Sequence, residues 1–395
     1  MLFRSTACII AALADRAGWH RGALGGAAAY LIWLNLLEGQ GGQSPVFYNV
    51  LTVGAAWLAM PRRDDAAAGM RRGLAAMALI ALAMEIKTSV LLEGVALGLW
   101  LLARARATGR PIGQVAAYAA ALVAVALLPT LAAWGWFAAH GHGGEWVYAN
   151  ITSILQRQSD PAAERYSNLA KLILITSPLL AMAALAWRVR ARDGEGAAAQ
   201  RFLFGWAAVA CGSVLAFGTW FDHYALPMLV PLAACAAGFL GEHRRGPRWA
   251  LPILAFVAIG GHVLLVTKVI RRVNAAEFAA LVAAVERAPA GCLFVYSGPP
   301  MLYRASGRCV TTRYVFPSHL PRTREQGAIG VDSRAELDRI LATGPAVVVM
   351  QQVYSGEERP IRRHFIAALR AAGYRLHART KLGNQPAFVL VRGSH

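Results

Sequence analysis

The sequence predicts an α-helical polytopic membrane domain of about nine to ten segments, followed by a small extracytoplasmic α/β domain. The chain is 57% hydrophobic and only 15% charged, which lies outside the usual range of soluble globular domains. Its arginines lie in short clusters between apolar stretches, as is typical of cytoplasmic loops in membrane proteins. After Arg272 the pattern changes to short apolar runs that alternate with amphipathic ones.

We therefore predict a membrane domain over residues 1–272 and a separate domain over 273–395. The apolar segments of the first domain cover 23–38, 44–60, 73–86, 88–103, 115–137, 168–187, 202–221, 225–241 and 249–267. With the arginine clusters inside, the outward-facing parts are 38–44, 85–87, 140–167, 221–224 and the chain after 267. This topology places the second domain on the extracytoplasmic side of the membrane. The net charge of +19 is spread over many loops, so we expect no nucleic-acid partner.

The stretch from Gly73 to Ala103 has a charged turn, Glu85-Ile86-Lys87, in its middle. One helix of that length would rise roughly 46 Å and overshoot a hydrocarbon core of about 30 Å. It would also leave Glu85 and Lys87 near the bilayer centre. Two helices that meet at the turn place Lys87 at the outer interface instead. There it is either a snorkelling lysine, with Glu85 as its partner, or a cation that binds a lipid-linked phosphate. Glu85 is itself a further candidate for substrate binding.

The first residues, 1–14, form an apolar fragment that is too short to span a membrane. Two interpretations are open. The fragment is an interfacial or frayed helix, or it is the end of a helix whose upstream part this sequence lacks. We favour the second interpretation.

The C-terminal domain is predicted to combine helices with mostly parallel strands. The expected helices are 274–287, a short one after 297–300, 333–341 and 359–372, and the expected strands are 292–296, 309–313, 346–350, 374–380 and 387–391. Cys292 and Cys309 each open a strand, and these strands are expected to be neighbours. In an oxidising compartment the two cysteines can form a disulfide, and two buried free thiols are the equal alternative.

Several polar residues of the predicted outer parts are candidates for substrate binding. In the loop 140–167, Arg157, Asp160, Arg165 and Tyr166 suit a phosphate or a sugar, although a plain polar loop explains them equally well. The turn 221–224 carries Asp222, His223 and Tyr224 at the entry to the next helix. Its alternative is a polar interfacial turn with an aromatic belt residue.

Two groups of residues resemble metal ligands in composition only, and we predict no metal site from either. His140 and His142 precede Glu145 among flexible glycines. Asp64 and Asp65 lie beside arginines on the cytoplasmic side. A solvated loop is the better interpretation of both.

The order of these motifs resembles that of the bacterial GT-C polytopic glycosyltransferases of family 39, which are related to protein O-mannosyltransferases and aminoarabinose transferase. The run from Arg71 to Lys87 is similar to their arginine, Leu-Ala-Gly, apolar and lysine pattern. The run His223–Pro231 resembles their Tyr, Leu-Pro and Pro helix entry. Residues 303–308, 311–314 and 341–345 are similar to their periplasmic tail. The resemblance extends from about Leu24 onward, and the order of the motifs carries it.

The resemblance implies transfer of a sugar from a polyprenyl-phosphate donor to a lipid, glycan or protein acceptor. It also implies a bacterial inner membrane, with the transfer and the second domain on the periplasmic side. It places Lys87 at the donor phosphate and His223 and Tyr224 in a later outer turn. The family's general base is an aspartate on the first outer loop, sometimes with a divalent metal nearby. The first helix and loop that carry it are missing from this sequence, so no residue matches the base.

Two other classes of protein compete with a glycosyltransferase. One is an inactive truncated paralogue, or a membrane protein that binds the lipid without chemistry. The other is a transporter with Glu85 and Lys87 on its path, for which the expected internal repeats are not seen.

Overall fold

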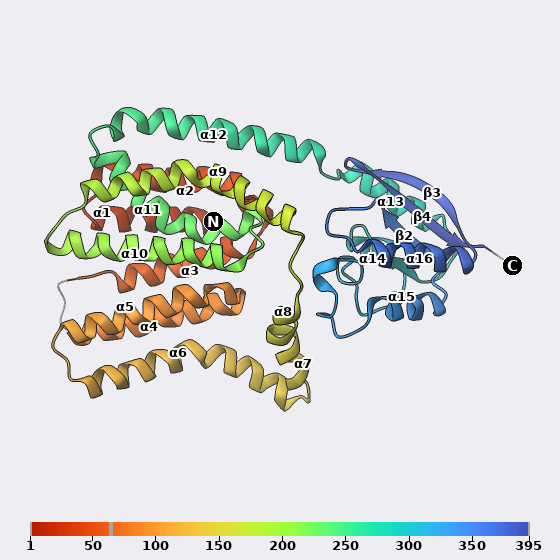
Figure 1. The fold of residues 1–395 in the computed structure, drawn as a ribbon, viewed down its shortest axis with the longest axis horizontal. Helices are drawn as coiled ribbons and strands as arrows, with labels where there is room; N and C mark the ends of the chain where they lie inside the picture. Colours follow the sequence, from red (N-terminus) through yellow and green to blue (C-terminus); the bar gives the residue numbers. More distant parts are fainter. Residues whose placement is uncertain (1, 63–65, 394–395) are drawn as a thin grey trace. The chain divides into compact units, whose positions relative to one another are not determined.

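The computed structural model describes residues 2–62 and 66–393, so the Asp64-Asp65 pair lies outside the described residues. The chain divides into two compact units (Figure 1). Unit 1 contains Met1–Gly141 with Ala163–Leu265, and unit 2 contains His142–Ala162 with Val266–His395. The segment 142–162, which the sequence analysis placed in an outer loop of the membrane domain, therefore packs with unit 2.

Unit 1 is built from helices. They are α1 (Leu2–Arg16), α2 (Ala23–Leu36), α3 (Ser44–Ala59), α4 (Ala66–Ile86), α5 (Leu91–Ala107), α6 (Ile112–Ala139), α9 (Ala162–Ala186), α10 (Gly194–Phe217), α11 (Leu226–Glu242) and α12 (Gly246–Arg271). Every apolar segment predicted from the sequence overlaps one of these helices.

Six helical stretches among the described residues are long and apolar enough to cross a membrane. They are Thr88–Ala107, Ile112–Ala139, Ala162–Val189, Gly194–Phe217, Asp222–Glu242 and Gly246–Glu286. The protein thus combines membrane-length apolar helices with a small C-terminal sheet.

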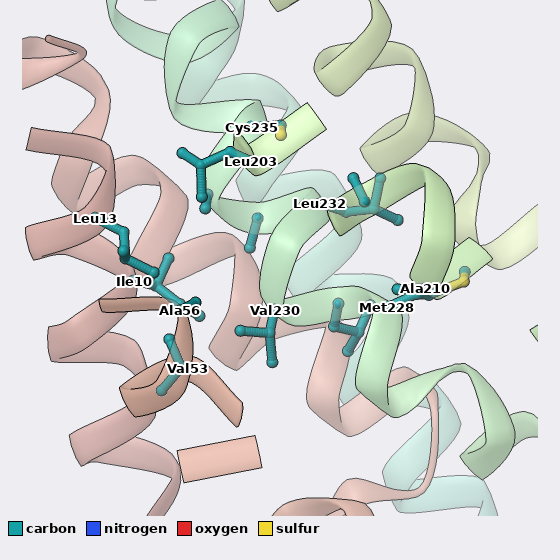
Figure 2. Close-up of a cluster of buried hydrophobic side chains, with 14 of the residues drawn as sticks. Ile10, Leu13, Val53, Ala56, Leu203, Ala210, Met228, Val230, Leu232 and Cys235 are labelled. Carbon is teal, nitrogen blue, oxygen red and sulfur yellow. The ribbon is translucent and has the colours of Figure 1, made fainter. Parts of the chain in front are cut away.

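Helix α11 forms the centre of unit 1. It contacts α1, α2, α3 and α10, and almost all of its residues are buried. Figure 2 shows Met228, Val230 and Leu232 of α11 in one cluster with side chains of α1, α3 and α10. Ile10 and Leu13 of α1 are fully buried in this cluster. Helix α1 therefore packs into the core along one face, and the interpretation as a frayed helix is wrong.

Helices α4 and α5 pack against each other and are joined at Lys87. Helix α4 ends at Ile86, Lys87 itself is extended, and a short 3-10 turn at Thr88–Val90 leads into α5. The stretch from Gly73 to Ala103 is thus two helices rather than one, as its central charges predict. One end of this hairpin carries the Glu85–Lys87 turn and the other carries arginines.

Unit 2 holds a four-stranded sheet with the strand order β1-β2-β4-β3. The strands are β1 (Leu293–Val295), β2 (Val347–Gln351), β3 (Tyr374–Leu382) and β4 (Gln385–Arg392). Strands β1 and β2 pair in parallel, but β4 is antiparallel to both β2 and β3. The prediction of mostly parallel strands is wrong because a short turn at Gly383, with a φ of +60°, joins β3 to β4 as a hairpin.

Helices cover both faces of this sheet. Successive strand residues point to opposite faces, so the valines of β2 alternate between two cores. Helices α13 (Ala275–Glu286) and α14 (Met301–Ser306) cover one face, and α15 (Ser333–Ala342) and α16 (Arg359–Ala371) cover the other. These helices match the predicted ones, and α13 begins with a capping box between Asn274 and Glu277.

The predicted strand 309–313 does not form. Val310 makes only an isolated bridge to Leu293, and the carbonyl of Cys309 accepts a hydrogen bond from the Leu293 N–H at 2.9 Å. The sulfur of Cys309 is bonded to that of Cys292. Of the two alternatives left open by the sequence, the structure contains the disulfide, which holds this segment beside β1.

Candidate functional site

Lys87 lies half-buried at the turn between α4 and α5. Its Nζ is 4.5 Å from the centre of the Tyr224 ring, within the range of a cation–π contact. No carboxylate of the described residues lies within ion-pairing distance of this ammonium group, and no described group forms a hydrogen bond with Nζ. A half-buried cation without a counter-ion is a candidate for binding an anion.

Glu85 is not the partner of Lys87. Its side chain is exposed, and its Oε1 accepts a hydrogen bond of 2.5 Å from the hydroxyl of Thr130 on α6. The reading in which Glu85 neutralises Lys87 is therefore wrong. Glu85 instead ties the end of α4 to α6.

The predicted outer turn 221–224 is a single 3-10 turn, Asp222–Ala225, at the start of α11. Its side chains are ordered by ring contacts. The rings of His223 and Tyr224 are 4.8 Å apart, and the ring of Phe217 stacks on Tyr224 at 6.0 Å. Since α11 is the buried centre of unit 1, this turn holds Tyr224 rigidly beneath Lys87.

A chain of charged groups runs along the same end of unit 1. His223 Nδ1 lies 3.9 Å from Glu38 Oε2, at the C-terminal end of α2. The same imidazole lies within electrostatic reach of Lys87 and Asp222. Asp222 is buried and its Oδ2 lies 2.5 Å from Lys171 Nζ of α9. The structure thus brings together a residue of α9 and residues at the ends of α2, α4 and α11.

Backbone strain is concentrated at this end as well. Among the described residues, Glu38 and Trp220 are the non-glycine residues with a positive φ, at 63° and 48°. Such conformations cost roughly 1–3 kcal/mol each and cluster at functional sites. Trp220 shortly precedes the turn that contains His223, and Glu38 lies beside His223 in space. Both strained residues therefore lie next to this turn.

An apolar cavity of about 340 Å³ lies between α3, α4, α5 and α10. Leu99, which is 63% exposed, lines it, so the cavity opens at the outer surface of the helices. Its lining also includes polar groups. Glu93 is buried and accepts a hydrogen bond from Trp206 Nε1, while the buried Nε1 of Trp100 has no hydrogen-bond partner among the described residues.

Glu93 also connects this cavity to Lys87. A second, small pocket of about 10 Å³ is lined by Lys87, Tyr48, Ser89, Tyr224 and Glu93. Glu93 is therefore part of the wall of both spaces. The sequence analysis missed it, although a carboxyl group inside an apolar segment is itself a signal of function.

Arg165 and Tyr166 lie near the Lys87 end of unit 1 but do not join the Lys87 pocket. Arg165 Nε donates a hydrogen bond of 2.6 Å to the Gly218 carbonyl, and its guanidinium lies 5.4 Å from the Trp220 ring. Tyr166 is 65% exposed and lies 6.3 Å from the same ring. These contacts hold the loop after α10.

Arg157 and Asp160 make ion pairs inside unit 2. Arg157 Nε lies 3.2 Å from Glu325 Oε2. Asp160 is only 3% exposed, and its carboxylate lies 3.4 Å from Arg322 and 3.7 Å from Arg324. The segment 142–162 is thus attached to the loop 320–325, which the loop composition alone did not reveal.

We expect the substitution Asp160→Asn to loosen this attachment. Removing one partner of a buried ion pair typically costs about 3–5 kcal/mol, because the remaining charge stays buried without compensation. Hydrogen exchange of the peptides within 142–162 in the full chain should therefore become faster. The matched control is Asp338→Asn, whose exposed pair with His364 should be worth about 0–1 kcal/mol. Unchanged exchange in Asp160→Asn would contradict the attachment.

His140, His142 and Glu145 do not form a metal cluster. His142 Nδ1 lies 3.8 Å from Glu145, and His140 Nδ1 lies 2.7 Å from the carbonyl of Trp136. Within residues 2–62 and 66–393, no three His, Cys, Asp or Glu side chains come together as metal ligands would.

No protein-family model matches the chain, and no curated protein matches it either. The function must therefore be argued from the site itself, because a fold alone does not specify an activity.

Proposed function

We propose that this protein is a membrane glycosyltransferase in which Lys87 binds the phosphate of a polyprenyl-phosphate-linked sugar. The observation that carries the proposal is the ammonium group of Lys87, held over Tyr224 without a carboxylate partner among the described residues. A phosphate anion would supply the missing counter-charge. The family resemblance of the sequence assigns Lys87 the same role.

The apolar cavity supports the lipid part of this proposal. Its volume of about 340 Å³ falls within the range of ligand sites, and its lining is almost entirely apolar. It opens at Leu99 on the outer surface, where a lipid chain can enter from the bilayer. The pocket at Lys87 has room for about one water molecule, so the donor phosphate would bind at its mouth.

Glu38 is our candidate for the general base. In the proposed step, the acceptor hydroxyl oxygen attacks the anomeric carbon of the sugar and the bond from that carbon to the phosphate oxygen breaks. Polyprenyl phosphate leaves with the electron pair, and the hydroxyl proton moves to the Glu38 carboxylate. His223, which lies 3.9 Å from this carboxylate, would position it.

The proposed topology follows from the charged groups at the two ends of the helices. In it, nine to ten segments cross or enter the membrane, the arginine clusters are cytoplasmic, and Lys87, Glu38 and unit 2 are periplasmic. The disulfide of unit 2 supports an oxidising compartment for this part of the chain. The acceptor is a lipid, a glycan or a protein.

The experiment is a transfer assay with the full chain in phospholipid vesicles. Polyprenyl phosphates that carry radiolabelled hexoses or pentoses are supplied with a bacterial membrane extract as the source of acceptors. We expect consumption of at least one donor and transfer of the label. If polyprenyl phosphate binds but no donor is consumed, the protein is a lipid-binding protein. If it does not bind, the proposed function is wrong.

A further inference from the structure

A second polar pocket lies at the end of the α4–α5 hairpin away from Lys87. It has a volume of about 70 Å³ and is formed by the ends of α3, α4, α5 and α6. Four arginines line it, namely Arg62, Arg72, Arg104 and Arg110. Since Arg72 precedes Lys87 by 15 residues of mostly helical chain, the two sites are about 22 Å apart along α4.

The walls of this arginine pocket are fixed by hydrogen bonds and close packing. Tyr118 of α6 is buried, and its hydroxyl donates to the Met70 carbonyl at 3.4 Å. The same hydroxyl fills the space beside Gly73, where a Cβ atom would lie only 1.9 Å from it. Arg72 Nε donates to the Leu58 carbonyl at 3.4 Å. The pocket is thus a built feature of the helix ends rather than a chance gathering of flexible side chains.

Two of the four arginines lack an acidic partner among the described residues. Arg104 and Arg110 make no ion pair with any residue in 2–62 or 66–393. Arg110 Nη1 donates to Gln114 at 3.0 Å, but its buried Nε has no hydrogen-bond partner among these residues. Arg62 lies 5.3 Å from the Trp57 ring, and Arg16 lies 5.1 Å from the same ring. Cations gathered so closely repel one another unless an anion binds between them.

We infer that the arginine pocket binds the phosphate group of an anionic membrane phospholipid. Guanidinium groups form paired, charge-assisted hydrogen bonds to phosphate oxygens. Basic pockets between transmembrane helices are known to bind anionic head groups. Leu58, Met70 and Leu101 also line the pocket, so an apolar wall for the acyl chains adjoins the charged one. The pocket holds a group of about phosphate size and is too small for a nucleotide.

The test measures lipid retention by the full-length protein with native mass spectrometry. The protein is exchanged from detergent into equal mixtures of phosphatidylglycerol and phosphatidylcholine. We expect the wild-type protein to retain phosphatidylglycerol preferentially. In the Arg104→Gln/Arg110→Gln variant this preference should fall about tenfold or more, since the variant removes charged hydrogen bonds to the phosphate.

The matched control is Arg106→Gln, an exposed arginine of the same helix that does not line the pocket. It should retain the wild-type preference. Inorganic phosphate at millimolar concentration separates the two sources of the anion. If phosphate displaces no lipid, the site is a lipid site. If the wild-type protein binds phosphate but retains both lipids equally, the inference is wrong.

Equal retention of both lipids by the wild-type protein would overturn the inference without any variant, so a variant that fails to fold does not leave it untested. An equal fall in the Arg106→Gln control would overturn it too. The inference does not depend on the proposed glycosyltransferase activity, because the two sites lie at opposite ends of the hairpin.

Discussion

Replacing Lys87 with alanine is expected to lower sugar transfer about 100- to 1000-fold while the protein still inserts into membranes. A single group that stabilises developing negative charge contributes a factor of this size. In our account, Lys87 neutralises the leaving polyprenyl phosphate, because no described carboxylate forms an ion pair with it. Lys87→Arg keeps the positive charge and should retain a substantial part of the activity. The measurement is the rate of donor consumption in vesicles.

The control is Lys381→Ala, which removes a lysine of unit 2 that is 73% exposed. It should transfer sugar at the wild-type rate. If Lys87→Ala also keeps the wild-type rate, Lys87 is the snorkelling interfacial lysine that the sequence left open as an alternative.

Replacing Glu38 with glutamine should lower the transfer rate about 100- to 10,000-fold, the range of general base catalysis, without weakening donor binding. Glutamine is nearly isosteric with glutamate but cannot accept the acceptor's proton. Binding of polyprenyl phosphate should stay within about twofold of the wild-type value, because Lys87 makes the phosphate contact. The measurements are the transfer rate at saturating donor and the dissociation constant of polyprenyl phosphate.

Glu85→Gln is the matched control for Glu38→Gln. Both carboxylates lie at the same end of the helices, but Glu85 is exposed and bonded to Thr130. We expect Glu85→Gln to transfer sugar at nearly the wild-type rate. The opposite pattern, with Glu85→Gln inactive and Glu38→Gln active, would transfer the role of base to Glu85 and contradict our assignment.

The hairpin could be predicted from sequence because charge inside an apolar stretch has few tolerable positions. Glu85 and Lys87 force a turn, and the structure ends α4 at Ile86. The membership of α1 in the core was not predictable in the same way. Its length alone suggested a fragment, whereas its burial depends on contacts with α11 far along the chain.

The sequence predicted several residues of the site but not which of them are neighbours in space. The importance of Lys87 followed from its local environment, but its contact with Tyr224 joins residues that are 137 positions apart. Glu38 was noted only as the start of an outward-facing stretch. Its relation to His223 depends on how α2 and α11 pack, and no local pattern encodes that.

Unit 2 shows the same limit. Period-2 and helical patterns located its helices and most strands, but strand direction depends on pairing partners. The hairpin at Gly383 makes β3 and β4 antiparallel, and the expected strand 309–313 is reduced to an isolated parallel bridge at Val310. Likewise, the polar composition of 142–162 suggested a solvated loop, while the burial of Asp160 required the distant arginines of the loop 320–325.

The central claim is that Lys87 and the apolar cavity together form the site of the donor lipid. The most direct test is photo-crosslinking of the full chain with a polyprenyl phosphate that carries a diazirine on its first isoprene units. The account predicts labels on cavity residues of α5 and α10, such as Leu99 and Val209, and loss of these labels in Lys87→Ala. Labels that lie elsewhere on the chain, or that persist unchanged in Lys87→Ala, would contradict it.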